Sequence, residues 1–279
     1  MALAPSLTIF RHRAYLQFWL MRVAVAAARQ MEAVAIGWQV YELARDPISE
    51  GGLALDIPQA AFMIGLVGLA QFIPVLLFSL VGGQAADRLN RKMILVVSNL
   101  FRLGGTVALL STIFLPAAQA LPIIFSVAVL LGFVNAFTPA AASALYPQLV
   151  PRSDLPTAIA FNSLGFQTAK IVGPALGGLF LAAGGLTFVY SAAFVLIAFG
   201  IVSIATAATP AHEKLNNAKG LSMVFEGIRY IGRNKIVLGA ISLDLFVVFF
   251  GGVGARRTLL GPANLEVLEV GGGGLAPAA

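Results

Sequence analysis

Two acidic residues, Glu32 and Asp244, lie well inside long apolar stretches of the sequence. An ionisable side chain at membrane depth is costly unless it is paired or hydrated, so each such residue is a candidate for function. An acid in this position can take up a proton from one side of a membrane and release it to the other. Glu32 is the first candidate for a transported proton. Asp244 is the second, with a structural pairing to a basic side chain on a neighbouring helix as its alternative.

Basic and amide side chains interrupt the same apolar stretches. Arg29 and Glu32 are three residues apart and share a helix face, and Arg22, seven residues before Arg29, lies along it. This face is expected to border a cavity, with a structural ion pair between Arg29 and Glu32 as the alternative. Arg102 is expected either to line a cavity or to snorkel to the inner surface. The other candidates for a proton or substrate pathway are Gln167 and Lys170.

The stretch GGQAADRLNRK, residues 82–92, concentrates charge in a chain that is only 11% charged. Gly82 and Gly83 remove side-chain bulk at a helix end and let another helix approach closely. Asp87 can pair with basic neighbours or cap an adjacent helix N-terminus. The basic residues of this turn keep it on the cytoplasmic side of a membrane; they are Arg88, Arg91 and Lys92.

A second pattern of small residues, GPALGG, covers residues 173–178. Gly173 and Gly177 form a small-xxx-small face suited to close helix packing, and Pro174 bends or loosens the helix. Gly178 completes the pattern. Generic helix packing is the alternative to a functional role.

The composition places this chain in lipid. It is 59% hydrophobic with a mean hydropathy of +0.90, whereas a soluble domain carries about a quarter charged residues. A helix crosses a bilayer with about 20 residues, and we identify seven apolar runs as spans: 15–43, 60–85, 93–115, 121–146, 156–183, 186–208 and 236–252. The runs are continuous rather than alternating in polarity, which favours helices over strands. We therefore predict an all-α, polytopic helical membrane protein.

The loops between these runs alternate in charge. Basic residues gather before the first run and after each even-numbered run. The loops after the odd-numbered runs have a single basic residue, Arg45, which is surrounded by acidic residues. The positive-inside rule therefore places the N-terminus in the cytoplasm. Residues 209–235 form a cytoplasmic linker, in which LSMVFEGIRYIGRNK has the spacing of an amphipathic helix. Aromatic residues near the ends of the first run are expected to be interfacial anchors; they are Phe18, Trp19, Trp38 and Tyr41.

Chemistry that needs cysteine, a metal cluster or a bound nucleotide has no support in the sequence. The chain has no cysteine, and its two histidines, His12 and His212, fall in expected loops. No span carries His, Asp and Glu at ligand spacing, and no G-x-x-x-x-G-K-[ST] loop occurs. The net charge of +6 reflects basic cytoplasmic loops rather than a nucleic-acid surface. We expect no enzyme, catalytic residue, cofactor, metal or obligate protein partner; the expected partners are the lipid bilayer, a small-molecule substrate and protons.

The turn at residues 82–92 resembles the G-x-x-x-D-R-x-G-R-[KR] motif between helices 2 and 3 of the major facilitator superfamily. The matching positions are Gly83, Asp87, Arg88, Arg91 and Lys92. Asn90 stands where the family has its second glycine. In that family the motif is a cytoplasmic latch that bridges the two halves of the transporter, so the resemblance implies a transport gate.

Two further stretches carry the resemblance. GPALGG resembles the G-P-x-x-G-G element in helix 5 of proton-coupled exporters of the superfamily. Residues 135–163 and the stretch GWQVYELARDP, residues 37–47, look like the transmembrane secretion effector branch, with its siderophore exporters and macrolide-efflux proteins. The arginine motif that many of these exporters carry in helix 4 is absent. The resemblance implies alternating-access export of a drug-like or siderophore-like molecule, driven by protons, in the inner membrane of a bacterium.

Transporters of the superfamily have twelve helices in two six-helix halves. By this resemblance, residues 1–208 form the N-terminal six-helix bundle, residues 236–252 begin the second bundle, and residues 253–279 form a glycine-rich tail unlike the family. We expect a reading-frame shift or a truncated gene model to explain the tail, and a chain of this kind to be inactive alone. The alternatives are a membrane-embedded binding or regulatory subunit, or a half-transporter that acts as a dimer.

Overall fold

A computed structural model of the chain describes residues 7–45 and 55–209, and these residues are helical apart from short connections. The helices are η1 (Leu7–Arg11), α1 (Arg13–Arg45), α2 (Ile57–Arg88), α3 (Arg91–Ser111), η2 (Thr112–Phe114), α4 (Ala117–Leu145), η3 (Tyr146–Gln148), η4 (Arg152–Asp154) and α5 (Leu155–Thr206). The predicted all-α class is confirmed for this part of the chain. The predictions beyond residue 209, on the amphipathic linker, the seventh run with Asp244 and the tail, lie outside the described residues.

Several of the helices have the length and composition of membrane spans. Four stretches are long and apolar enough to cross a membrane: Ile57–Arg88, Arg91–Phe114, Ala117–Gln148 and Arg152–Thr206. α1 has 33 residues, which exceeds the about 20 that a span needs, but it carries internal charges. The described part of the chain is therefore a helical membrane protein.

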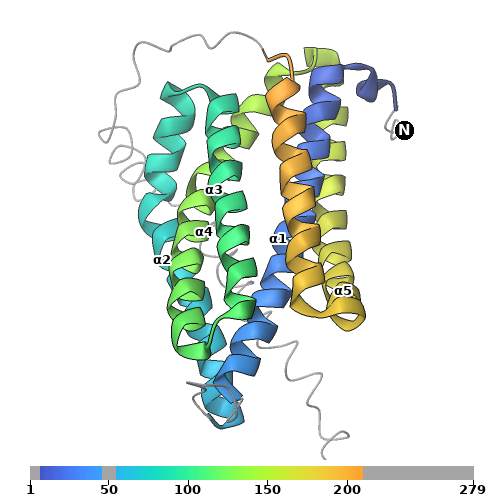
Figure 1. The fold of residues 1–279 in the computed structure, drawn as a ribbon. Coiled ribbons are helices and arrows are strands. Elements are labelled where there is room, and N and C mark those ends of the chain that lie inside the picture. Colours follow the sequence, from blue (N-terminus) through green and yellow to red (C-terminus); the bar gives the residue numbers. More distant parts are fainter. Residues whose placement is uncertain (1–6, 46–54, 210–279) are drawn as a thin grey trace, which may run out of the picture. The chain divides into compact units, whose positions relative to one another are not determined.

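α5 turns back on itself at Gly184 and Gly185. Gly185 has φ 69° and ψ −165°, a backbone conformation that favours glycine because other residues carry a Cβ that clashes there. The helical geometry is interrupted at these two residues, between the predicted runs 156–183 and 186–208. The two segments of α5 run in opposite directions, drawn in yellow and orange in Figure 1, and both pack against α1.

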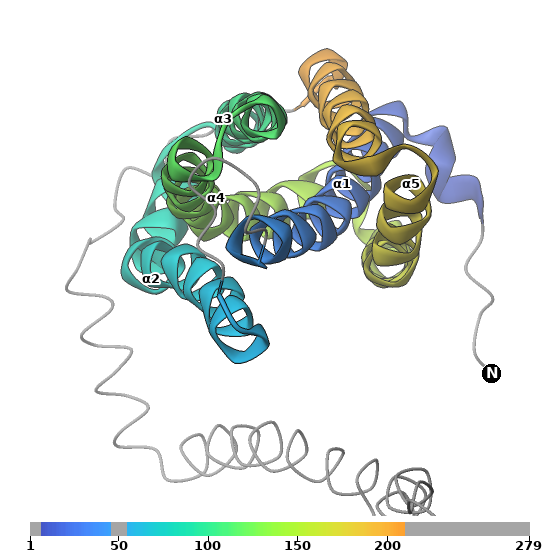
Figure 2. The same cartoon turned by 60° about the horizontal axis from the view of Figure 1, so that its bottom comes forward.

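α1 lies between the two sides of the bundle, with α5 on one side and α2 and α4 on the other (Figure 2). α2 and α4 approach closely at Gly82, where a Cβ would collide with the backbone carbonyl of Ala136. The close approach predicted for Gly82 is confirmed, whereas a Cβ on Gly83 would meet no atom within 4 Å among the described residues.

The GPALGG segment packs its small face against α1. A Cβ on Gly173 would lie 2.6 Å from the Cβ of Gln30, and one on Gly177 would lie 3.2 Å from the Cα of Met31. The packing role predicted for these two glycines is thus confirmed. Gly178 faces the other way, since no described atom lies within 4 Å of a Cβ placed there.

Two large apolar clusters and a small third one fill the described bundle, and polar side chains lie between the two large ones. The first includes Tyr15, Phe18, Met21, Leu95 and Leu145, and the second includes Met31, Val40, Leu109, Ile124 and Tyr190. On α3, the buried residues between Leu95 and Leu109 are mostly polar. A buried polar layer therefore crosses the bundle midway along α1 and α3.

Two of the expected interfacial anchors are instead part of the interior. Phe18 is fully buried, and Trp19 donates a hydrogen bond from Nε1 to the backbone oxygen of Phe161 at 2.9 Å. The expectation is wrong for these two residues because Phe18 packs in an apolar cluster beside Tyr146 and Trp19 binds the backbone of α5. Trp38 is 46% exposed, as an anchor would be.

Candidate functional site

Glu32 lies in the polar layer with both carboxylate oxygens engaged. Glu32 is buried, with 2% of its surface exposed. Arg102 of α3 donates from Nη1 to Oε2 of Glu32 at 3.0 Å, and Thr106 donates from Oγ1 to Oε1 at 2.5 Å. A buried carboxylate that keeps its charge needs such partners, because burial without them is strongly unfavourable. Glu32 is therefore bound to α3 by an ion pair and a hydrogen bond.

Arg102 extends the network to a third helix. Its Nη2 donates to Oδ1 of Asn135 in α4 at 2.8 Å, and its side chain is 3% exposed. One guanidinium thus connects α1, α3 and α4, with its two terminal nitrogens directed at two acceptors. The planar guanidinium holds such a geometry, which a lysine ammonium at the same place does not reproduce.

The observed pairing corrects two expectations about this region. Glu32 pairs with Arg102 rather than with Arg29, so the alternative of an Arg29–Glu32 ion pair is wrong. Arg102 is buried and paired, so the snorkelling alternative is also wrong. Sequence spacing within one helix suggested Arg29 as the partner, but the orientation of α1 turns Glu32 toward α3 and leaves Arg29 exposed.

Thr106 and Asn135 are site residues that the sequence did not reveal. Thr106 follows Arg102 by one helical turn, and the backbone oxygen of Arg102, 3.0 Å from Oγ1, is the alternative acceptor for its hydroxyl hydrogen. Asn135 is a polar residue inside the predicted run 121–146. An amide side chain within a mostly apolar run was the sequence feature that could have indicated a site residue. Its partner, Arg102, is known only from the packing of α4 against α3.

Two cavities of about 240 Å³ each lie on either side of the Glu32–Arg102 pair. One cavity is lined by Ala33, Ile36, Gly37 and Val40 of α1 together with Glu32 and Gln71. The other is lined by Met21, Arg22, Val25 and Ala26 together with Asn135 and Phe166. Both cavities are lined by Arg29 and Arg102. The prediction that this face of α1 borders a cavity is confirmed, and the two arginines separate one cavity from the other.

Some buried polar atoms in the layer have no partner among the described residues. Both side-chain amide atoms of Asn99 and the Nε of Arg22 are in this position. Each such group costs about 1–3 kcal/mol relative to a satisfied one. Natural structures contain few groups of this kind, so these polar atoms are candidates for contact with water or a ligand.

The predicted pathway residues of α5 lie beside α1. Arg22 places Cζ 5.3 Å from the ring centre of Phe166, and Lys170 places Nζ 4.8 Å from the same ring centre. Gln167 and Lys170 are exposed, and neither makes a hydrogen bond or ion pair within the described residues. The structure thus brings Arg22 and Lys170 together at Phe166, although they are distant in sequence.

The charged turn at residues 82–92 ties three helices together. Arg91 donates from Nη1 to the backbone oxygen of Ala144 at the end of α4, at 3.3 Å. Lys92 donates from Nζ to the backbone oxygen of Ala207, just after α5, at 2.7 Å. Both cations therefore bind carbonyls at helix C-terminal ends, where the helix dipole favours positive charge.

The cap of α3 is Asn90 rather than Asp87. Oδ1 of Asn90 accepts hydrogen bonds from the backbone nitrogens of Lys92 and Met93 at 3.0 and 3.3 Å. Asn and Gly are both accepted at helix N-caps, which explains how Asn90 can replace the family's glycine. Asp87 and Arg88 are exposed, and Asp87 makes no hydrogen bond within the described residues.

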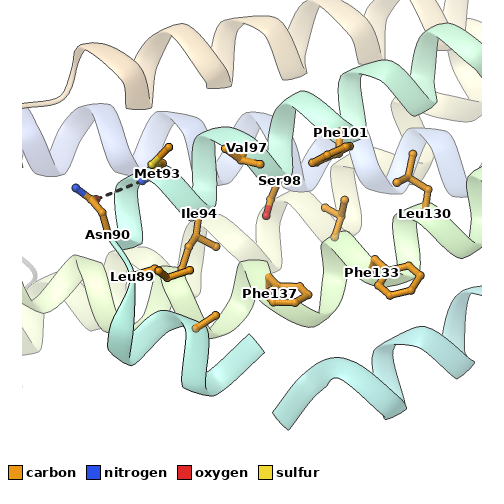
Figure 3. A pocket seen from close by; sticks show the side chains of 12 residues that line it. Leu89, Asn90, Met93, Ile94, Val97, Ser98, Phe101, Leu130, Phe133 and Phe137 are labelled. Carbon is orange, nitrogen blue, oxygen red and sulfur yellow. Dashed lines mark hydrogen bonds between the residues drawn. The ribbon is translucent and has the colours of Figure 1, made fainter. Parts of the chain in front are cut away.

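An apolar groove of about 630 Å³ lies beside this turn, between α2, α3 and α4. Figure 3 shows Met93, Val97, Phe101, Phe133 and Phe137 around it, with Asn90 at one end and the hydroxyl of Ser98 directed inward. The groove is far more apolar than the two cavities at Arg102. Its walls are suited to hydrocarbon, so we do not assign it to the charged pathway.

The described residues contain no group of three or more His, Asp or Glu side chains that could hold a metal ion. Among these residues, the polar layer holds one buried carboxylate, Glu32, beside the guanidinium groups of Arg29 and Arg102. A helical membrane bundle with a buried charge network and cavities on both sides is typical of membrane transport proteins.

Comparison with known families identifies the class further. Residues 3–260 match the family model described as transmembrane secretion effector. The chain belongs to this family of the major facilitator superfamily, as the resemblance indicated.

Three relatives are similar to this chain. The multidrug efflux pump Tap of Mycolicibacterium fortuitum is 27% identical over 80% of the chain and 53% of its own length. The uncharacterized transporter YfiS of the superfamily in Bacillus subtilis is 25% identical over 74% of the chain and 49% of its own length. The enterobactin exporter EntS of Salmonella typhi is 31% identical over 48% of the chain and 31% of its own length. The chain spans about half the length or less of these relatives.

Proposed function

We propose that this chain belongs to an exporter that moves a small molecule out of a bacterial cell in exchange for protons, and that Glu32 is the proton site. The observation that carries the proposal is the buried Glu32–Arg102 pair between two cavities. The efflux relatives Tap and EntS support export as the direction. No chemical reaction is part of this function.

Protonation of Glu32 is the switching event in this proposal. The ionised carboxylate binds Arg102 and Thr106 and so holds α1 against α3. A proton removes the negative charge, weakens the ion pair and lets α1 and α3 change their packing. Protons and substrate then compete because each favours a different conformation of the bundle, which is the requirement for exchange.

The proposed topology places six spans in the bundle, with the N-terminus in the cytoplasm. α5 contributes two of the spans, because its segments meet at Gly184 and Gly185. In the complete transporter this bundle faces a second half, and the exposed Asp87 with the basic residues of its turn forms the latch between the halves. The α1–α5 contact through Gly173 and Gly177 holds the pathway helices together.

Glu32→Gln tests the proton site in inside-out membrane vesicles that contain the complete transporter, with both halves present. Respiration acidifies these vesicles, and an acridine dye reports the gradient. Addition of ethidium or dihydroxybenzoate should release protons and restore dye fluorescence if substrate and protons exchange. We expect no such recovery with Glu32→Gln, because the amide cannot carry a proton across.

Glu42→Gln is the matched control, since Glu42 is an exposed acid at the far end of the same helix. This variant should behave like the unchanged protein. Full proton release by Glu32→Gln would contradict the assignment of the proton site. The absence of release by the unchanged protein with every probe would contradict proton coupling.

A further inference from the structure

Three cations lie within about two helical turns of one another along the contact between α1 and α5. Arg29 is at the midpoint of α1, beside Gln30, which contacts Gly173 of α5. Lys170 is one turn before Gly173, and Lys170 and Arg22 both lie near the ring of Phe166. These contacts place the three charges along the α1–α5 contact, and Arg22 and Arg29 line the same cavity.

No acid within the described residues neutralises these cations. Glu32 is the acid at this depth, and its two oxygens are taken by Arg102 and Thr106. The other described acids lie at helix ends; they are Glu42, Asp56, Asp87 and Asp154. Arg29 is exposed on this face and makes no hydrogen bond or ion pair in the described part of the chain. Within the described residues, Arg22, Arg29 and Lys170 therefore form no ion pair with an acid, and an unpaired charge inside a membrane bundle is costly unless a ligand supplies the counter-charge.

The cavity on this side has the parts that an aromatic anion requires. Arg22, Arg29 and Arg102 line it together with Phe166, and its volume is about 240 Å³. The ring of Phe166 attracts cations through its quadrupole but carries no net charge, so Arg22 and Lys170 keep their full charge for another partner. The same ring offers apolar contact to the body of a flat ligand.

We propose that the substrate is an organic anion, with a carboxylate or similar acidic group bound between Arg22, Arg29 and Lys170 and an aromatic body against Phe166. Guanidinium groups bind carboxylates with two parallel hydrogen bonds, which gives the arginines a direct role in recognition. A cationic compound is repelled by the same three charges. This inference rests on the proposed export function and names its substrate class.

The test is binding of three probes that differ in charge. Naphthoate, naphthylmethanol and naphthylmethylammonium share an aromatic body and are anionic, neutral and cationic at neutral pH. Each is titrated by calorimetry into the 279-residue chain in phosphatidylcholine nanodiscs, with empty nanodiscs as the baseline. We expect naphthoate to bind at least about tenfold more tightly than the alcohol, as one charge-assisted contact requires. Equal or tighter binding of the alcohol or the ammonium compound overturns the proposal.

Substitutions locate the site. Arg29→Gln and Lys170→Gln should each weaken naphthoate binding by about tenfold and leave binding of the alcohol unchanged, which also shows that the variant is folded. Arg45→Gln is the control, because Arg45 also stacks on an aromatic ring, that of Tyr41, but at the other end of α1. Unchanged naphthoate affinity in both Arg29→Gln and Lys170→Gln contradicts the proposal.

The binding test and the proton test can be contradicted independently, so a failure of the anion site is distinguishable from a failure of proton coupling. Loss of proton release in Glu32→Gln with no charge preference among the probes removes the anion site and leaves proton coupling in place. A clear preference for naphthoate without substrate-driven proton release keeps the anion site and removes proton coupling.

Discussion

Arg102 is the residue on which the polar layer depends. It binds Glu32 and Asn135 at once, and it lines both cavities. Because the pair is buried, each partner compensates the desolvation of the other. Loss of one partner leaves an uncompensated charge, which is worse than loss of both.

This asymmetry gives a prediction for stability. Arg102→Gln should lower the free energy of unfolding by about 3–5 kcal/mol, because Glu32 stays buried without its cation. The double variant Glu32→Gln with Arg102→Gln should be more stable than Arg102→Gln alone. Thermal unfolding followed by tryptophan fluorescence measures both, with Arg45→Gln as an exposed control. A double variant that is less stable than Arg102→Gln would show that the two residues act independently.

The contact between α1 and α5 is the feature that matters at the scale of elements. Glycines of α5 let its backbone approach α1, and this approach places Phe166 and Lys170 beside Arg22. The pattern GPALGG indicated a small face from sequence alone. It did not show which of its glycines make contact, because that depends on the rotation of α5 about its own axis.

Two neighbouring glycines test this packing. Gly173→Leu should destabilise the protein by about 1–3 kcal/mol, because the new side chain would meet Gln30 and force α1 away from α5. Gly178→Leu should have little effect, since a Cβ there meets open space. Thermal unfolding in one detergent compares the two variants. Equal loss of stability would contradict the observed direction of the small face.

The distribution of charge over the whole molecule concerns its orientation in the membrane. Arg88, Arg91 and Lys92 lie in the turn after α2 and Arg152 lies just before α5, whereas the turn before α4 has no basic residue. This asymmetry favours a cytoplasmic location for the first two regions.

The cysteine-free chain makes this orientation measurable. Ser153→Cys and Gln119→Cys each introduce one exposed thiol, at the start of α5 and of α4 respectively. An impermeant maleimide should label Gln119→Cys in intact spheroplasts and Ser153→Cys only after permeabilisation. The reverse pattern would place the N-terminus outside, because the two sites lie at opposite ends of α4.

The sequence alone determined the class of this protein and the positions of its apolar helices. Continuous apolar runs of span length can satisfy their backbone only as helices in lipid, so composition and pattern were sufficient for the predicted fold class. The motifs at residues 82–92 and 173–178 were sufficient to indicate the family. The interfacial roles of Phe18 and Trp19 were predicted wrongly because distance to a helix end does not show which face is covered.

Only the tertiary structure decided which charges meet. Glu32 and Arg29 are neighbours in sequence, but Arg102, seventy residues away, is the partner of Glu32. The reason is that the rotation of each helix about its axis is set by packing against other helices, which no single run of residues encodes. The same rotation leaves Arg29 and Lys170 without an acid among the described residues and so creates the proposed anion site.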